Sequence, residues 1–311
     1  MRRTPIGDVV IAIDVGGTSI KSALVEAGSG TVVGDLRRHR TGADRGGQAV
    51  VDTVLEIATT LAADAVRANR TATAAGVAAP GVIDEAGGIV VWAANVGFRS
   101  VPLRDLVEKA LGLPAALGHD VRTGALAEAR LGAGRGVGRV WFVPVGTGIA
   151  AAYVRDGHTD PGAHGASGEL GHVVVRPDGP ECACGQRGCL ETLASAAAVA
   201  RRYRERSGED LDAAGVVARV GAGDSVAREV WADTVDALAD GLRIGVTLHD
   251  PDMIVIGGGL AEAGAALLDP LAAALRGRLT FQTMPSLVRA ALGDRAGCLG
   301  AALLAHDLVA S

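Results

Sequence analysis

The 311-residue sequence has few aromatic side chains and no long apolar run. Aromatic residues make up 3% of the chain, so valine, isoleucine, leucine and alanine must fill the core. The longest stretch without a charged residue, 140–154, is shorter than the roughly 20 apolar residues of a membrane-spanning helix. The apolar run 9–13 is too short for the core of a secretory signal. These absences predict a soluble cytoplasmic protein with no membrane partner.

Basic charge and disulfide-forming cysteines are also scarce. The net charge is −5, and Lys21 and Lys109 are the only lysines. A protein with net negative charge binds nucleic acid poorly, so we expect no nucleic-acid partner. Three of the four cysteines are crowded between residues 182 and 189, which is not typical of a disulfide framework.

Two distant segments share one pattern of strand, glycine turn and strand. The run 9–15 ends at Gly16-Gly17 and is followed by the apolar run 20–25, and the run 139–145 ends at Gly146-Thr147-Gly148 and is followed by 149–154. Each pattern is typical of a β-hairpin. Either one α/β unit is duplicated or the hairpins are unrelated. Further strands are expected at 74–80, 114–117 and 253–256, and helices at 47–69, 103–111, 121–131, 194–206, 227–248, 260–275 and 296–309. The alternation predicts an α/β fold.

Three glycine turns follow predicted strands, at Gly16-Gly17-Thr18, Gly146-Thr147-Gly148 and Gly257-Gly258-Gly259. Glycine lets backbone N–H groups approach an anion closely, so these turns are candidate phosphate sites, although glycine after a strand is also an ordinary turn residue. The sequence contains neither a P-loop nor a G-x-G-x-x-G motif. Asp14, at the end of the first strand, either helps to hold Mg²⁺ or caps its own turn.

Asp120 follows a short apolar strand and precedes a helix. It is either a helix N-cap or a general base at the carboxyl end of a strand, where α/β folds place their ligands. Glu169 and Glu191 flank the cysteine-rich loop and are either ordinary surface residues or acceptors for sugar hydroxyls.

The strongest local signal is His172 with Cys182, Cys184 and Cys189. These residues form the Cys₃His set of a structural zinc site, and free or redox-active thiols are the alternative. Cys298, alone in the last predicted helix, is expected to be a small core residue.

Taken in order, the motifs resemble the ROK family (repressor, open reading frame, kinase), which includes bacterial glucokinases and N-acetylhexosamine kinases. Asp14-Val-Gly-Gly-Thr-Ser-Ile-Lys21 resembles its first phosphate motif, and Gly146-Thr-Gly148 its second. Gly76-Val-Ala-Ala-Pro-Gly-Val-Ile-Asp84 resembles its G-x-x-x-P-G-x-x-D segment, and Asn95 falls near its sugar-contacting loop. Glu169-Leu-Gly-His172 and Cys182-Ala-Cys-Gly-Gln-Arg-Gly-Cys-Leu-Glu191 match its most specific motif.

The resemblance implies an actin-like (ribonuclease H-like), duplicated ATPase fold of two domains around a cleft that holds ATP. The expected domains are 1–118 plus 297–311, and 119–296. The implied ligands are ATP, Mg²⁺ and a structural Zn²⁺, and a homodimer or higher homo-oligomer is expected. Asp120 becomes the base for the sugar's primary hydroxyl. The implied sugar contacts are Asn95, His119, Asp120, Glu169, His172 and Glu191, and the implied nucleotide contacts are Asp14, Gly16, Gly17, Thr18, Lys21, Gly146, Thr147, Gly148, Gly257, Gly258 and Gly259.

The expected function is ATP-dependent phosphorylation of a hexose, glucose first, at the 6-hydroxyl. His119 departs from the family, because most of its kinases have Asn before the catalytic Asp. This keeps open an amino-sugar kinase acting on N-acetylmannosamine, N-acetylglucosamine or a 3-amino-hexose. A non-catalytic sugar sensor is a weaker alternative. A sugar-responsive repressor is disfavoured, because only 13 residues precede Asp14.

Overall fold

The computed structural model describes residues 7–310. Residues 1–6 and 311, which the expected domain ranges include, lie outside the described part. The chain divides into two compact units. The first unit runs to Ala127 and adds Pro161–Ala166 and the chain from Asp294 onward, and the second unit comprises Glu128–Asp160 and Ser167–Gly293.

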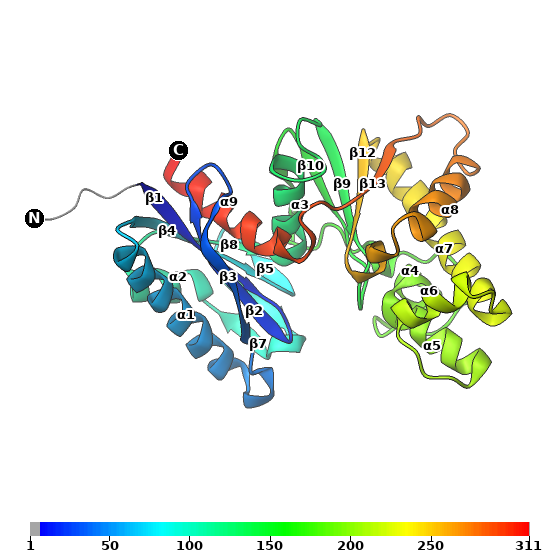
Figure 1. The fold of residues 1–311 in the computed structure, drawn as a ribbon, viewed down its shortest axis with the longest axis horizontal. Helices are drawn as coiled ribbons and strands as arrows, with labels where there is room; N and C mark the ends of the chain where they lie inside the picture. Colours follow the sequence, from blue (N-terminus) through cyan, green and yellow to red (C-terminus); the bar gives the residue numbers. More distant parts are fainter. Residues whose placement is uncertain (1–6, 311) are drawn as a thin grey trace, which may run out of the picture. The chain divides into compact units, whose positions relative to one another are not determined.

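The first unit is built on a five-stranded sheet in the order β3-β2-β1-β4-β8 (Figure 1). The pairs β1–β2 and β2–β3 are antiparallel, whereas β1–β4 and β4–β8 are parallel. Residues 9–15 of β1 are buried without interruption, as expected for a central strand covered on both faces. The strands are β1 (Asp8–Val15), β2 (Ser19–Glu26), β3 (Val32–Arg40), β4 (Thr71–Ala79) and β8 (Ala115–His119).

Helices cover this sheet. The core joins β1 and β4 to the apolar face of α1 (Gly47–Arg67), which carries Val50, Val54 and Leu61 at helical spacing. Helix α9 (Ala296–Ala310) packs on β1, β4 and β8, and a Cβ on Gly76 of β4 would lie 1.8 Å from the Ala301 carbonyl oxygen. The unit also contains α2 (Leu103–Leu111), the start of α3 (Asp120–Arg130) and a small sheet of β5 (Val82–Asp84), β6 (Ile89–Ala93) and β7 (Phe98–Val101).

The second unit repeats this sheet topology in the order β11-β10-β9-β12-β13. Here too the first strand, β9, has two strands in antiparallel pairing on one side, β10 and β11, and two in parallel pairing on the other, β12 and β13. The matching strand orders identify the two hairpins as parts of a duplicated unit in an actin-like fold. The strands are β9 (Arg139–Pro144), β10 (Ala152–Arg155), β11 (His158–Thr159), β12 (Met253–Gly257) and β13 (Ser286–Arg289).

Helix α7 (Ser225–His249) is central to the packing of the second unit. It contacts α4, α5, α6 and α8, and its side chains share a core with Trp141 of β9 and Ile254 of β12. Gly245 makes this approach feasible, since a Cβ there would lie 1.9 Å from the Trp141 ring. The other helices are α4 (Leu190–Ala194), α5 (Ala196–Ser207), α6 (Ala213–Gly221) and α8 (Ala265–Arg276).

Several elements differ from the sequence expectation. The segment 149–154 forms a strand only from Ala152, because Ala151 and Ile149 pair with the backbone of Gly168 and Gly171 instead. The predicted helix 260–275 is interrupted at Gly264, which has a φ of 57°. The α-helices and strands that were not predicted are β3, β5, β6, β7, β11, β13, α4 and α6.

The division into units also differs from the expected domain ranges. Residues 119–127 and 161–166 belong to the first unit, as do residues 294–296, whereas 119–296 had been assigned to the second domain. None of the helices within residues 7–310 combines the length and apolar character of a membrane span.

Candidate functional site

The first glycine turn, Gly16–Thr18, joins β1 to β2. Gly16 donates its N–H to the Ser19 carbonyl at 3.1 Å, and a Cβ on Gly16 would lie 2.8 Å from that same oxygen. Asn95 reaches the turn from the small sheet, since its side-chain nitrogen lies 3.4 Å from the position of a Cβ on Gly17. The structure therefore brings Asn95 and the first phosphate motif together.

Asp14 and Lys21 form a cross-strand pair beside this turn. The β1–β2 register places them opposite each other, and Lys21 Nζ lies 3.4 Å from Asp14 Oδ2. Burial raises the pKa of Asp14, and the Lys21 ammonium partly opposes the shift. A Cβ on Gly297 would lie 2.6 Å from the Asp14 carboxyl, so the first turn of α9 also faces this carboxylate. The positive N-terminal end of the helix favours the charged form.

His119 ends β8, and Asp120 begins α3. Asp120 Oδ1 accepts a hydrogen bond from the Val121 N–H at 2.7 Å, and His119 Nε2 lies 3.4 Å from the same oxygen. The His119 Nδ1 atom is buried without a hydrogen-bond partner. Burial, assisted by the charge of Arg122, lowers the pKa of His119 to about 4, so the ring is neutral at pH 7. The junction therefore presents a partly exposed carboxylate beside a neutral imidazole.

Two glycine turns meet in the second unit, at the carboxyl ends of β9 and β12. Val145 donates to the Gly257 carbonyl at 2.9 Å and accepts from the Leu260 N–H at 3.0 Å. Gly258 has a φ of 75°, and a Cβ there would lie 2.4 Å from the Val145 carbonyl oxygen. The turn 146–148 and the turn 257–259 are therefore adjacent, at the sheet edge where α/β folds bind ligands.

Glu191 lies against the turn 146–148. Its Oε2 accepts the Ile149 N–H at 2.9 Å, and a Cβ on Gly148 would lie 2.5 Å from the same oxygen. A cavity of about 470 Å³ is lined by Thr147, Glu191 and Arg201 and by residues of the cysteine loop. Arg201 carries no sequence signal of its own, although it lies one helical turn beyond the N-terminus of α5.

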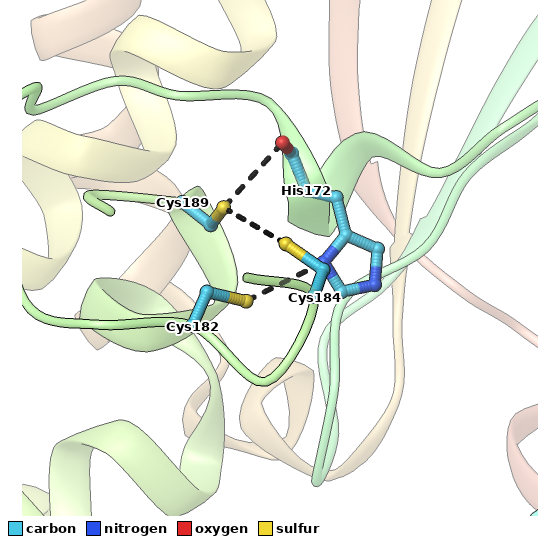
Figure 2. A group of neighbouring side chains, drawn as sticks. All are labelled: His172, Cys182, Cys184 and Cys189. Atoms are coloured by element: carbon cyan, nitrogen blue, oxygen red, sulfur yellow. Dashed lines mark hydrogen bonds between the residues drawn. The ribbon is translucent and has the colours of Figure 1, made fainter. Parts of the chain in front are cut away.

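His172, Cys182, Cys184 and Cys189 form one cluster (Figure 2). Their ligand atoms lie within 4.8 Å of one another, with 3.6 Å between Cys182 Sγ and His172 Nδ1 and 3.7 Å between Cys184 Sγ and Cys189 Sγ. Zn–S bonds of about 2.3 Å in tetrahedral geometry place sulfur atoms about 3.8 Å apart. The donor set and its spacing therefore fit a tetrahedral metal ion.

The imidazole of His172 has two sides. Figure 2 shows one nitrogen among the sulfurs and the other pointing away from them. The second nitrogen, Nε2, lies 3.8 Å from Glu169 Oε2. His172 thus joins the Cys₃His cluster to Glu169, and Glu191 follows Cys189 by two residues in α4.

Sequence reasoning missed Glu85 and Arg122. Glu85 lies in the turn between β5 and β6, and Arg122 lies in the first turn of α3 with only 3% of its surface exposed. Two sequence positions could have drawn attention to them: Glu85 directly follows the Gly76–Asp84 motif, and Arg122 lies two residues after Asp120.

The remaining predicted residues divide between the units. Asp14, Gly16, Gly17, Thr18, Lys21, Asn95, His119 and Asp120 lie in the first, and Gly146, Thr147, Gly148, Glu169, His172, Glu191, Gly257, Gly258 and Gly259 lie in the second.

The paired sheets and their glycine turns define an actin-like ATPase fold, and comparison with known proteins agrees. The ROK family model matches residues 10–308. A glucokinase of Thermotoga maritima is 34% identical, over 96% of this chain and 98% of its own length. The chain belongs to the ROK family.

Two solved structures share the fold over nearly their whole length. A ROK hexokinase from Thermus thermophilus is 33% identical with a TM-score of 0.86, covering 97% of this chain and 99% of its own. A ROK glucokinase from Streptomyces griseus, in complex with glucose and AMPPNP, is 28% identical with a TM-score of 0.81, covering 96% and 99%.

Proposed function

We propose that this protein is a cytoplasmic ATP-dependent hexose kinase that transfers the γ-phosphoryl group of ATP to the 6-hydroxyl of glucose. The observation that carries the proposal is Asp120, a partly exposed carboxylate at the carboxyl end of β8, in a chain that also has glycine turns in both repeats. The full-length similarity to glucokinases supports it, including one that binds glucose and AMPPNP. A homodimer is the expected assembly.

Asp120 would accept the proton of the 6-hydroxyl as the oxygen attacks the γ-phosphorus. The turns at 16–18 and 146–148 would hold the phosphates through backbone N–H groups, and 257–259 would flank the adenosine. Asp14 would hold Mg²⁺, directly or through water, and the ion would neutralise charge on the phosphates when bound. Catalysis by such a site is mostly positioning and charge neutralisation.

The Cys₃His cluster would hold a structural Zn²⁺ ion, because four protein ligands leave no open coordination position for chemistry. In this proposal the metal fixes the loop that carries three sugar contacts. Glu169 and Glu191 would accept hydrogen bonds from sugar hydroxyls, and His172 would contact the sugar through Nε2 while Nδ1 binds the metal.

The test is the Asp120→Asn variant, assayed for ATP-dependent glucose phosphorylation. Loss of a general base should lower kcat by roughly 10² to 10⁴. Asp105→Asn serves as the control, because Asp105 is a mainly exposed carboxylate on α2. Near-wild-type turnover by Asp120→Asn would remove Asp120 from the mechanism. The absence of ATP turnover with any sugar in the wild type would favour a sugar sensor instead.

An amino-sugar kinase is the second candidate, and His119 is the observation that favours it. Asn offers a donor and an acceptor from one amide, whereas the neutral imidazole of His119 directs Nε2 toward Asp120 and buries Nδ1. A panel of hexoses and amino sugars, assayed with wild type and His119→Asn, separates the two. Higher kcat/KM for an amino sugar than for glucose would overturn the glucokinase assignment.

A further inference from the structure

We propose that Glu85 and Arg122 are positioning residues for Asp120, because their partly buried ion pair fixes the junction of β8 and α3 from which Asp120 projects. This inference rests on the proposed kinase function and names the residues that hold its base in place. The two side chains come from different elements of the first unit, the β5–β6 turn and the first turn of α3.

The ion pair itself is tight. Arg122 Nε donates to Glu85 Oε1 at 2.9 Å, and Nη2 lies 2.9 Å from the same oxygen without making a hydrogen bond. Arg122 Nη1 also donates to the Gly165 carbonyl oxygen at 3.2 Å. The guanidinium therefore joins α3 to the β5–β6 turn and to the segment 161–166. That segment is packed closely, because a Cβ on Gly165 would lie 2.8 Å from the Ile83 carbonyl oxygen.

Glu85 also acts on the backbone of β8. Its Oε1 accepts the His119 N–H at 3.1 Å. β8 is the edge strand of its sheet, so the N–H groups that point away from β4 have no strand partner. Glu85 satisfies one of these donors at the residue next to Asp120. A change in Glu85 therefore releases the last residue of β8 as well as Arg122.

Stability alone does not explain this arrangement. The Arg122 side chain is 3% exposed and that of Glu85 is 27% exposed. Burying an ion pair costs about as much desolvation energy as it returns, and apolar replacements are often neutral or stabilising. A planar guanidinium that donates to a carboxylate through Nε and to a carbonyl oxygen through Nη1 supplies fixed geometry instead. A displacement of about 1 Å in a catalytic group is enough to lower turnover by roughly 10²-fold.

The same pair influences the neighbouring imidazole. The positive charge of Arg122 adds to burial in keeping His119 neutral. A neutral His119 presents Nε2 to Asp120 without placing a full positive charge beside it. Arg122 therefore acts on Asp120 mainly through the backbone via Glu85, and its charge only reinforces the neutral state that burial gives His119.

The test compares Glu85→Ala, Glu85→Gln and Arg122→Lys with Arg104→Gln. Arg104 is the matched control, because it holds the same β5–β6 turn through the Ala86 and Gly87 carbonyls without touching His119. The readouts are the KM for ATP and kcat per folded molecule, with the folded fraction taken from circular dichroism at the assay temperature. We expect Glu85→Ala to lower kcat by about 10- to 100-fold with the KM for ATP within about twofold.

Glu85→Gln keeps an oxygen for the His119 N–H, so it should restore part of the loss. Arg122→Lys keeps the charge but not the planar guanidinium, and it should lower kcat by about 10-fold. If Glu85→Ala does not fold, Glu85→Gln and Arg122→Lys still test the inference. The inference would be overturned if Glu85→Gln and Arg122→Lys both kept kcat within twofold of wild type. It would also be overturned if Arg104→Gln lost as much kcat as they do. A wild type that phosphorylates no hexose would instead refute the proposed function.

Discussion

Glu128 is a completely buried carboxylate on α3, and its replacement by glutamine should destabilise the second unit. Its Oε2 accepts the N–H groups of Ala133 at 3.0 Å and Ala291 at 3.1 Å, and its Oε1 accepts the Leu292 N–H at 2.7 Å. One side chain therefore fastens two segments that are far apart in the sequence to the end of α3.

The magnitude follows from these three bonds. Hydrogen bonds to charged groups contribute about 1.5–3 kcal/mol each, and a buried donor without an acceptor costs about 1–3 kcal/mol. In Glu128→Gln the amide oxygen can serve the two donors at the Oε2 position, but the NH₂ group then faces the Leu292 N–H. The lost charge removes a desolvation cost and offsets part of this. We expect a net loss of about 3 kcal/mol, which lowers Tm by roughly 6–12 °C in a domain of 150–250 residues.

Thermal unfolding followed by circular dichroism measures the effect. Glu108→Gln is the matched control, because Glu108 Oε1 accepts a single backbone N–H, that of Ala115, at 3.0 Å. Its cost should stay below about 1 kcal/mol. If the Tm of Glu128→Gln falls no further than that of Glu108→Gln, the three hydrogen bonds of Glu128 do not stabilise the fold as argued.

Two further predictions concern pH and metal. His119 titrates near pH 4 in the folded chain and near 6.5 when unfolded, so the unfolded state gains the proton first and stability falls between pH 6.5 and 4. By pH 5 this protonation lowers the free energy of unfolding by roughly 2 kcal/mol. Urea unfolding at pH 7 and pH 5 should therefore show a smaller loss of stability in His119→Asn than in wild type. An equal loss in both proteins would refute the assignment to His119. Mass spectrometry should find about one zinc per chain in wild type and Cys298→Ser but not in Cys189→Ser, and equal content in all three would contradict the site.

Elements with a strong apolar pattern were predictable from sequence. The helix 103–111 and the two hairpins begin with clear signals, and their glycine turns are fixed by local sterics. The edge strands were not. β3 carries Asp35, Arg37, Arg38 and Arg40 and is largely exposed, so its sequence lacks the alternation of a half-buried strand. β13 has only four residues and lies at the edge of its sheet.

The site was predictable where it consists of short motifs and not where it depends on distant contacts. The four candidate metal-ligand residues lie in one short stretch, and their donor types alone predict a common cluster. By contrast, the role proposed for Glu85 depends on its hydrogen bond from the backbone N–H of His119, and no spacing in the sequence encodes such a contact. The assignment of 161–166 to the first unit likewise rests on Arg122 and Ile83, far away along the chain.

The position of α9 has a consequence for synthesis on the ribosome. This helix covers one face of a sheet whose first strand begins at residue 8, and Gly76 lets the backbones of β4 and α9 meet without a side chain between them. The nascent first unit therefore leaves that face of its sheet bare while the whole second unit is translated. At about 5–20 residues per second, the interval between α3 and α9 lasts roughly 10–30 s. The part of the protein that emerges first is thus the later one to complete its native fold.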